Sequence, residues 1–218
     1  MSGIVGSYFN TRGSGVVAKL GTDGQVFTST GVGLSQGFED AAGGGAWTLI
    51  GTSVASDDGT LDQTGLDSTD YDTYAVVLSS IIPASDGVDT MLRLGDSGGI
   101  DSGSSDYVFH CSDVGPGGTG YNSQVSAGAN YIKLNPNIGT AAGEGFCAVL
   151  YIGAGRGDST VTPLVHGTAY GVINNGVTQG GALVGQRVAA IALDRVQFLF
   201  STGNVESGRM SVYGIAHA

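Results

Sequence analysis

Positively charged residues are scarce in this sequence of 218 residues. Eight Lys and Arg stand against 19 Asp and Glu, which gives a formal net charge of −11 at pH 7. A groove that follows a phosphate backbone needs clustered basic side chains, so we expect no nucleic acid partner.

Cysteines and long apolar runs are also scarce. Cys111 and Cys147 are the only cysteines, too few for a disulfide-held secreted scaffold, and they either pair across neighbouring strands or stay as buried free thiols. No stretch approaches the roughly 18 apolar residues of a membrane-spanning helix, so we expect no membrane insertion. The N-terminal MSGIVGSYFN has no basic region followed by an apolar run, so we expect no Sec-type signal.

Glycine, by contrast, is abundant, with 40 residues that follow no G-x-y period. Runs in which Val, Ile, Tyr and Phe alternate with polar residues lie between clusters of Gly, Ser and Asp, and few segments would build a long amphipathic helix. This pattern predicts an all-β protein, an antiparallel two-sheet sandwich of jelly-roll-like architecture.

The pattern of apolar residues differs between two regions of the chain. Residues 1–45 hold only short apolar pairs separated by Gly, Ser and Thr, which predicts an extended Gly-rich N-terminal arm for attachment or oligomerisation. Residues 46–218 predict the sandwich domain. About nine strands are expected in this domain, at 46–54, 71–82, 88–95, 105–111, 130–135, 144–153, 160–173, 186–194 and within 194–216. The stretch 186–192 also fits a helix.

The C-terminal stretch 194–216 has the clearest alternation. Val196, Phe198 and Phe200 alternate with the residues at 195, 197 and 199, STGNVESG follows, and a second alternating run begins at Met210. We interpret this stretch as a β-hairpin that pairs with the strands at 71–82 and 144–153. The turn PASDG at 83–87 likewise predicts that 88–95 pairs back on 71–82.

Acidic residues concentrate in the first half of the predicted domain. Between residues 41 and 113 there are twelve Asp and one basic residue, Arg93. Turn chemistry and solubility explain this bias, and the alternative is calcium held by loop carboxylates, with Asp96, Asp101 and Asp106 around one loop but without EF-hand spacing. We expect no other cofactor.

Three short motifs imitate functional sites. GDSGG at 95–99 matches the nucleophile motif of chymotrypsin-like proteases, but all three histidines follow it, whereas that family has its base upstream. GLSQG at 33–37 lacks the strand and helix of a nucleophile elbow. We therefore expect no enzymatic activity, although plentiful Asp leaves a two-carboxylate glycosidase as an alternative. An RGD tripeptide, with Arg156 and Asp158, lies in a predicted loop.

Recognition is expected in the predicted loops 95–105, 112–129 and 154–160, because the loops at the end of a sandwich carry binding sites. The candidate binding residues in or beside these loops are Asp96, Asp101, Asp106, Tyr121, Arg156 and Asp158. Tyr121 belongs to a set of tyrosines that would stack on sugars if exposed.

Several segments carry a family resemblance. WTLIGTSVASDDGTLDQTGLDSTDYDTYAVVLSSIIPASDGVDTMLRLGDSGG, SSDYVFH and DRVQFLFSTGNVESGRMSVYGI resemble a domain that recurs in structural and tail-fibre-like proteins of tailed bacteriophages. The arm sequence RGSGVVAKLGTDGQVFTSTGVG is similar to the glycine-punctuated leaders of phage fibre proteins.

The resemblance implies a virion component that is exposed outside the cell and is commonly a trimer, and it brings no catalytic residues. We expect a non-enzymatic virion structural protein, a tail-fibre or receptor-binding component. Its arm would bind other virion proteins, and its sandwich would bind a host surface glycan or protein. The alternatives are a capsid decoration or head-fibre protein and a calcium-dependent carbohydrate-binding module.

Overall fold

The computed structural model of the chain describes residues 25–28, 37–40, 46–66, 70–114, 121–155 and 161–216. The chain divides into two units, Met1–Gly45 and Ala46–Ala218. In the first unit, β1 (Gln25–Thr28) and β2 (Gly37–Asp40) form an antiparallel pair. Most of the predicted arm lies outside the described residues, so its role in attachment or oligomerisation stays a prediction.

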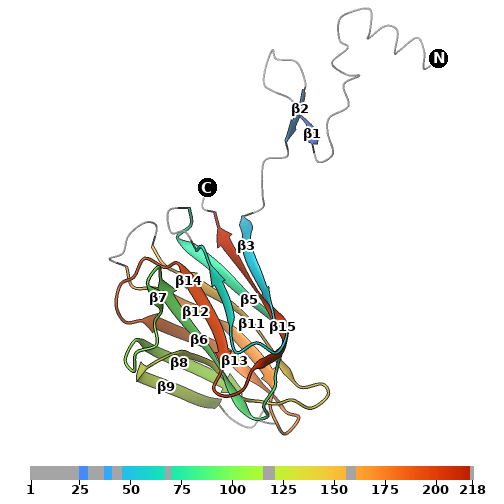
Figure 1. The fold of residues 1–218 in the computed structure, drawn as a ribbon, viewed down its shortest axis with the longest axis vertical. Helices are drawn as coiled ribbons and strands as arrows, with labels where there is room; N and C mark the ends of the chain where they lie inside the picture. Colours follow the sequence, from blue (N-terminus) through green and yellow to red (C-terminus); the bar gives the residue numbers. More distant parts are fainter. Residues whose placement is uncertain are drawn as a thin grey trace, which may run out of the picture. The chain divides into compact units, whose positions relative to one another are not determined.

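The second unit is a sandwich of two antiparallel sheets (Figure 1). The described residues contain no helix, and none of their segments would cross a membrane as a helix. The predicted all-β two-sheet sandwich is therefore confirmed.

The large sheet has eight strands and the small sheet five. The large sheet runs in the order β3 (Trp47–Val54), β15 (Val205–Ile215), β5 (Thr73–Pro83), β11 (Gly145–Gly153), β12 (Leu164–Val172), β13 (Thr178–Arg187), β8 (Tyr107–Val114) and β9 (Tyr121–Ala129). The small sheet runs in the order β10 (Ile132–Ile138), β6 (Val88–Asp96), β14 (Arg195–Phe200) and β4 (Leu61–Thr64), and β7 (Gly99–Ile100) pairs with β6.

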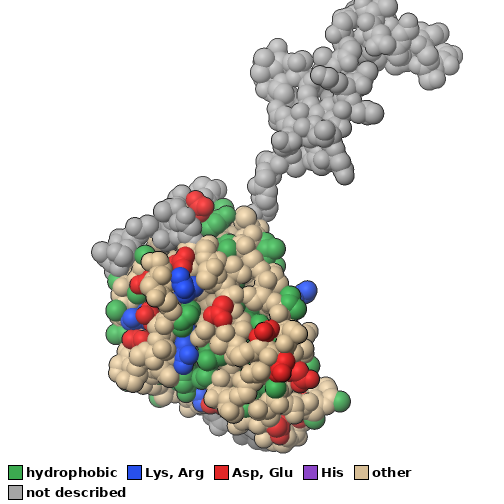
Figure 2. All heavy atoms as spheres, viewed as in Figure 1, with side chains coloured by type: hydrophobic (Ala, Val, Ile, Leu, Met, Phe, Trp, Pro, Cys, Tyr) green, Lys and Arg blue, Asp and Glu red, His purple; other side chains and the backbone are tan. Residues whose placement is uncertain are grey.

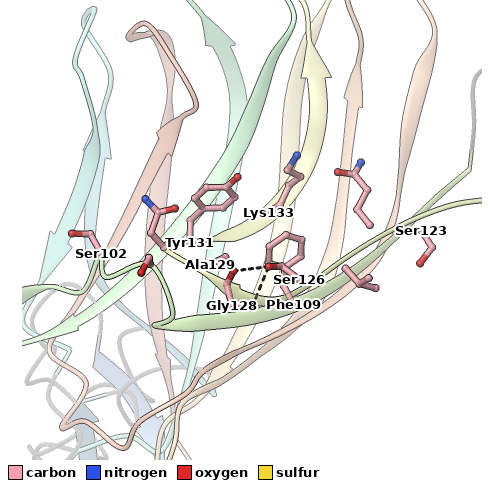
Figure 3. Close-up of a pocket in the computed structure, with 12 residues that line it drawn as sticks. Ser102, Phe109, Ser123, Ser126, Gly128, Ala129, Tyr131 and Lys133 are labelled. Carbon is pink, nitrogen blue, oxygen red and sulfur yellow. Dashed lines mark hydrogen bonds between the residues drawn. The ribbon is translucent and has the colours of Figure 1, made fainter.

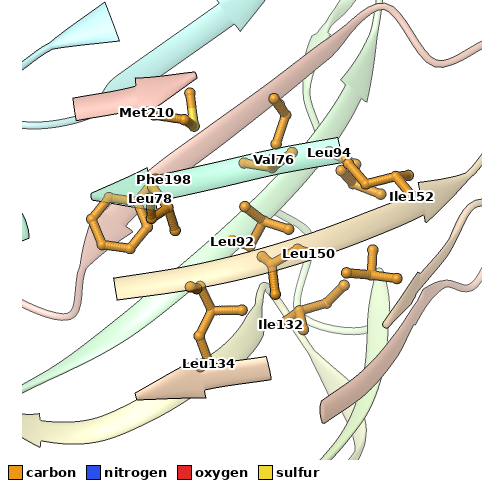
Figure 4. Close-up of a cluster of buried hydrophobic side chains, with 14 of the residues drawn as sticks. Val76, Leu78, Leu92, Leu94, Ile132, Leu134, Leu150, Ile152, Phe198 and Met210 are labelled. Atoms are coloured by element: carbon orange, nitrogen blue, oxygen red, sulfur yellow. The ribbon is translucent and has the colours of Figure 1, made fainter. Parts of the chain in front are cut away.

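The core lies between the inward faces of the two sheets. Alternate residues of each strand point inward, so Leu150 and Ile152 of β11 meet side chains such as Leu92 of β6 (Figure 4). Phe146 of the large sheet stacks on Phe198 of the small sheet, with ring centroids 5.9 Å apart. Each such buried side chain contributes about 1.5–3 kcal/mol of transfer free energy, which makes the packed interior the main source of stability.

The hairpin predicted at 194–216 is wrong. β14 pairs with β4 and β6 in the small sheet, whereas β15 pairs with β3 and β5 in the large sheet, so residues 201–204 carry the chain across the sandwich. The expected pairing with 71–82 is found for β15, but the strand at 144–153 pairs with β5 and β12 instead. The turn at 83–87 makes a second crossing, so β6 does not pair with β5.

Two further expectations need correction. The predicted loop 112–129 is largely strand, because it holds the end of β8 and all of β9, whose small residues hide the alternation. The strand expected at 186–194 lies earlier, as β13, and no helix forms there. Ile191 and Leu193 are nevertheless buried, since the irregular segment before β14 packs on the core.

Candidate functional site

The best candidate site lies where the chain passes from one sheet to the other. β9 is an edge strand of the large sheet, β10 is an edge strand of the small sheet, and only Asn130 and Tyr131 connect them. Two hollows of about 780 and 680 Å³ open along this edge and share Ser123, Gln124 and Lys133. We call them together the edge groove. It is also lined by Asp89, Ser102, Ser104, Phe109, Val125, Ser126, Gly128, Ala129, Asn130, Tyr131, Pro136, Asn137, Ile173, Asn174, Asn175 and Gln179.

Hydroxyl and amide side chains dominate this lining, with one aromatic pair among them (Figure 3). The rings of Phe109 and Tyr131 stack with centroids 6.2 Å apart and planes 24° apart. Ser126 Oγ donates a hydrogen bond to the Gly128 carbonyl at 2.9 Å, which holds the end of β9 in shape. Phe109 is 9% exposed and belongs to the core, so the partly buried Tyr131 is the ring that a pyranose could contact beside these hydrogen-bonding groups.

One ion pair stands in the groove. Lys133 Nζ lies 2.5 Å from Asp89 Oδ2, and the two side chains are 16% and 26% exposed. Asp89 Oδ1 also accepts a hydrogen bond from the Asn137 backbone N–H at 3.4 Å. The pair is electrically neutral overall, so the groove suits an uncharged ligand better than an ionised one.

A buried polar network lies behind the groove. Gln179 Nε2 donates to Asp113 Oδ2 at 2.8 Å, and Asn135 Nδ2 donates to the Gln179 carbonyl at 2.9 Å. Burial, and then the charge of Asp113, raises the pKa of the Cys111 thiol to about 11, so this cysteine stays protonated and unreactive near neutral pH. The network fixes the wall of the groove, to which Gln179 itself belongs.

The acidic residues expected to converge on calcium are only partly brought together. Arg187 Nε donates to Asp101 Oδ2 at 2.9 Å, and Arg187 Nη2 lies 3.7 Å from Asp106 Oδ1. Burial lowers the pKa of Arg187, but the hydrogen bond and charge of Asp101 and the charge of Asp106 outweigh it and raise the pKa overall. An arginine thus occupies the position between the two carboxylates where a cation would bind.

Asp96 takes a different role from these two carboxylates. Its Oδ1 accepts a hydrogen bond from the Gly98 backbone N–H at 2.7 Å, which closes the turn between β6 and β7. Within the described residues, no group of three or more His, Cys, Asp or Glu side chains is arranged to hold a metal ion.

The loop that holds Asp101 and Asp106 is anchored by a tyrosine. The Tyr107 hydroxyl accepts a hydrogen bond from the Leu94 N–H at 2.8 Å, and its single hydrogen is shared between the carbonyl oxygens of Leu94 and Asp101, at 2.8 and 3.0 Å. Burial raises the pKa of this phenol well above its usual range. The hydrogen bonds of Tyr107 therefore stabilise the loop beside the edge groove. This loop contains the groove residues Ser102 and Ser104.

The remaining predicted site residues are not located. Arg156 and Asp158 lie outside the described residues, as does the side chain of Tyr121, whose backbone begins β9. The two cysteines are both free: Cys111 is buried on the inward face of β8, whereas Cys147 is exposed on the outward face of β11.

Sequence reasoning missed most of the groove because its residues are small and polar. β9 reads as YNSQVSAGA, a stretch without bulky alternation, and its position at a sheet edge depends on pairings far apart in the chain. The sequence did mark the general region, since 112–129 and 95–105 were expected to carry recognition.

A serine and a histidine also meet near this edge. His110 Nε2 lies 2.8 Å from Ser123 Oγ, and both groups are exposed. A catalytic serine further needs an acid that orients the histidine and donors for an oxyanion. Among the hydrogen bonds of the described residues, no carboxylate contacts His110, so we interpret the contact as a cross-strand polar pair.

Comparisons with protein-family models and with curated proteins find no match to the chain.

Proposed function

We propose that this chain is a non-enzymatic structural protein of a bacteriophage virion, a tail-fibre or receptor-binding component, which binds an uncharged saccharide of the host surface in the edge groove. The resemblance of two long segments and one short segment to phage tail-fibre-like domains supports the virion assignment. The observation that carries the binding assignment is the edge groove itself, where hydroxyl and amide side chains surround the stacked Phe109 and Tyr131 rings.

Binding in this groove should not depend on calcium. Asp101 and Asp106 in the adjacent loop are already paired with Arg187. The hydrogen-bonding groups of the groove are Ser, Asn and Gln side chains, which recognise sugar hydroxyls directly. Saccharide binding that persists in a chelator distinguishes this proposal from a calcium-dependent carbohydrate-binding module.

The test is saccharide binding by the full chain, first on an array of bacterial surface glycans and then by calorimetry with the best ligand. We expect Gln124→Ala and Ser126→Ala to lower the affinity by about 10-fold each, since each removes a hydrogen-bonding group from the groove. The matched control is Tyr170→Ala, which removes an exposed tyrosine of β12 far along the large sheet from β9.

Unchanged unfolding midpoints would show that the variants are folded. Equal affinity of both groove variants and the wild type would place the saccharide elsewhere, and an array without any bound glycan would reject the binding proposal. Release of oligosaccharides from host polysaccharide by the purified chain would contradict the non-enzymatic assignment. Antibodies against the chain should label intact virions.

A further inference from the structure

Most of the large exposed hydrophobic side chains lie on the outward face of the large sheet. Eleven large hydrophobic side chains are exposed in the described residues, and nine of them point outward from this sheet. These nine, which define the outer face, are Trp47, Leu49, Val54, Val114, Val125, Val149, Leu164, Tyr170 and Val184. Exposed apolar side chains that gather on one face of a protein, instead of being scattered singly, are typical of an interaction site.

The same face is almost free of charge. The eight strands of the large sheet contain four charged residues: Asp113 is buried, Arg187 pairs with Asp101, and Glu206 and Arg209 belong to the first half of β15. The much smaller sheet points five charged side chains outward, namely Asp62, Asp89, Arg93, Lys133 and Arg195. Acidic and basic side chains are similarly interspersed on the face that Figure 2 shows. The outer face therefore carries little charge in a chain that is otherwise strongly acidic, although Arg209 is exposed on it opposite Val54.

The centre of the outer face has a shallow hollow of about 570 Å³. Val149, Tyr151, His166, Thr168, Ala182 and Val184 line it, from the three neighbouring strands β11, β12 and β13. Beside it, Tyr151 stacks on His166 with centroids 5.4 Å apart. A hollow of this size accepts a projecting apolar side chain from a partner.

The aromatic residues of this face do not form a platform for sugars. Trp47 contacts Tyr151 edge-on, with planes 88° apart, and is tilted by 51° against Tyr213. Seven of the nine defining side chains are Val or Leu, and the hydrogen-bonding groups beside them, such as His166 and Thr168, lie between aliphatic side chains. The chemistry of the face thus favours a protein partner.

We propose that the outer face is buried against another copy of this chain. Two copies with a net charge of −11 each repel one another over most of their surfaces, and the outer face is the large area where they meet without bringing acidic residues together. Contact between such faces brings Val and Leu side chains of both copies together and removes them from water. This inference goes beyond saccharide binding, because it concerns a different surface and does not depend on the edge groove.

The test is the mass of the full chain in solution, measured by light scattering over a range of concentrations. We expect a multiple of 21.8 kDa for the wild type and a fall to 21.8 kDa for Val149→Glu and for Val184→Glu, which place a charge in the central hollow. The matched control is Thr64→Glu, which adds the same charge at an exposed position of β4 in the small sheet and should leave the mass unchanged. A wild type of 21.8 kDa at all concentrations, or oligomers that both outer-face variants retain, would overturn the proposal.

The cysteines give a second readout on the same variants. Cys147 is exposed on the outward face of β11 and Cys111 is buried, so a thiol reagent reacts with Cys147 alone in the folded chain. In the wild type, the reaction should slow by about 10-fold or more as the concentration rises and the face becomes covered. In Val184→Glu it should stay fast throughout. A wild-type rate that is independent of concentration would contradict burial of this face, whereas loss of saccharide binding would leave both readouts unaffected.

Discussion

Gly208 occupies a backbone position that other residues would adopt only with strain. It lies in β15 at the second of two register shifts against β5, between Ser207 and Arg209, with φ of +113°. A Cβ atom at this position would lie 2.6 Å from the Ser80 carbonyl oxygen and 2.7 Å from Ile81 Cα. We expect Gly208→Ala to lower the free energy of unfolding by about 2 kcal/mol or more, as measured by urea denaturation.

Gly153→Ala is the matched control for this residue-scale prediction. Gly153 ends β11, has no left-handed φ, and has open space within 4 Å of a new Cβ atom. Its replacement should change the free energy of unfolding by no more than about 0.5 kcal/mol. Equal losses for the two variants would show that the bulge tolerates a side chain and that glycine is not required there.

At the scale of single elements, Arg187 connects the end of β13 to the loop before β8. Its side chain is 12% exposed and pairs with Asp101 and Asp106, so Arg187→Met would leave two neighbouring carboxylates without their counter-charge. We expect a loss of about 2 kcal/mol in unfolding free energy. Arg209→Met is the control, since Arg209 is exposed and forms no ion pair within the described residues.

The same two variants also test whether Asp101 and Asp106 bind Arg187 or a metal ion. If Arg187 is the cation of this loop, calcium should not raise the thermal midpoint of the wild type relative to chelator. A clear rise in the wild type, or a loss in Arg187→Met no greater than in Arg209→Met, would contradict the interpretation of Asp101 and Asp106 as structural residues.

Individual strands also show what could be predicted from sequence. Alternation correctly identified the buried side chains of β14 and β15, such as Phe198 and Met210, because it reports which side of a strand faces the core. It could not assign the two strands to different sheets, because a hairpin and a crossing between sheets bury the same residues. The sheet order depends on pairings such as β15 with β3, which lie more than 100 residues apart in the chain.

The candidate site was less predictable than the fold for a related reason. Asp101 and Asp106 were identified as neighbours from their spacing, but their partner Arg187 comes from a strand far along the sequence. The edge groove consists of small polar residues from β9, β10 and two loops, and such residues give no periodic signal. Its aromatic pair, Phe109 and Tyr131, becomes visible only once β8 and the β9–β10 connection are side by side.

At the scale of the whole molecule, the distribution of charge makes a prediction about salt. The chain carries −11, whereas the outer face contributes almost none of it, so two copies that meet on this face are held together by apolar contact and pushed apart by long-range repulsion. Salt screens that repulsion, with a Debye length that falls from about 30 Å at 0.01 M to about 8 Å at 0.15 M, and weakens no attractive ion pair on the outer face.

Self-association should therefore strengthen as sodium chloride is raised over this range, and sedimentation equilibrium at several concentrations would measure the change. The control is Thr64→Glu, which makes the net charge more negative. Its self-association should also strengthen as salt is raised, and more steeply than that of the wild type. Association that weakens with salt would mean that copies meet through opposite charges, such as those on the small sheet, and not through the apolar side chains of the outer face.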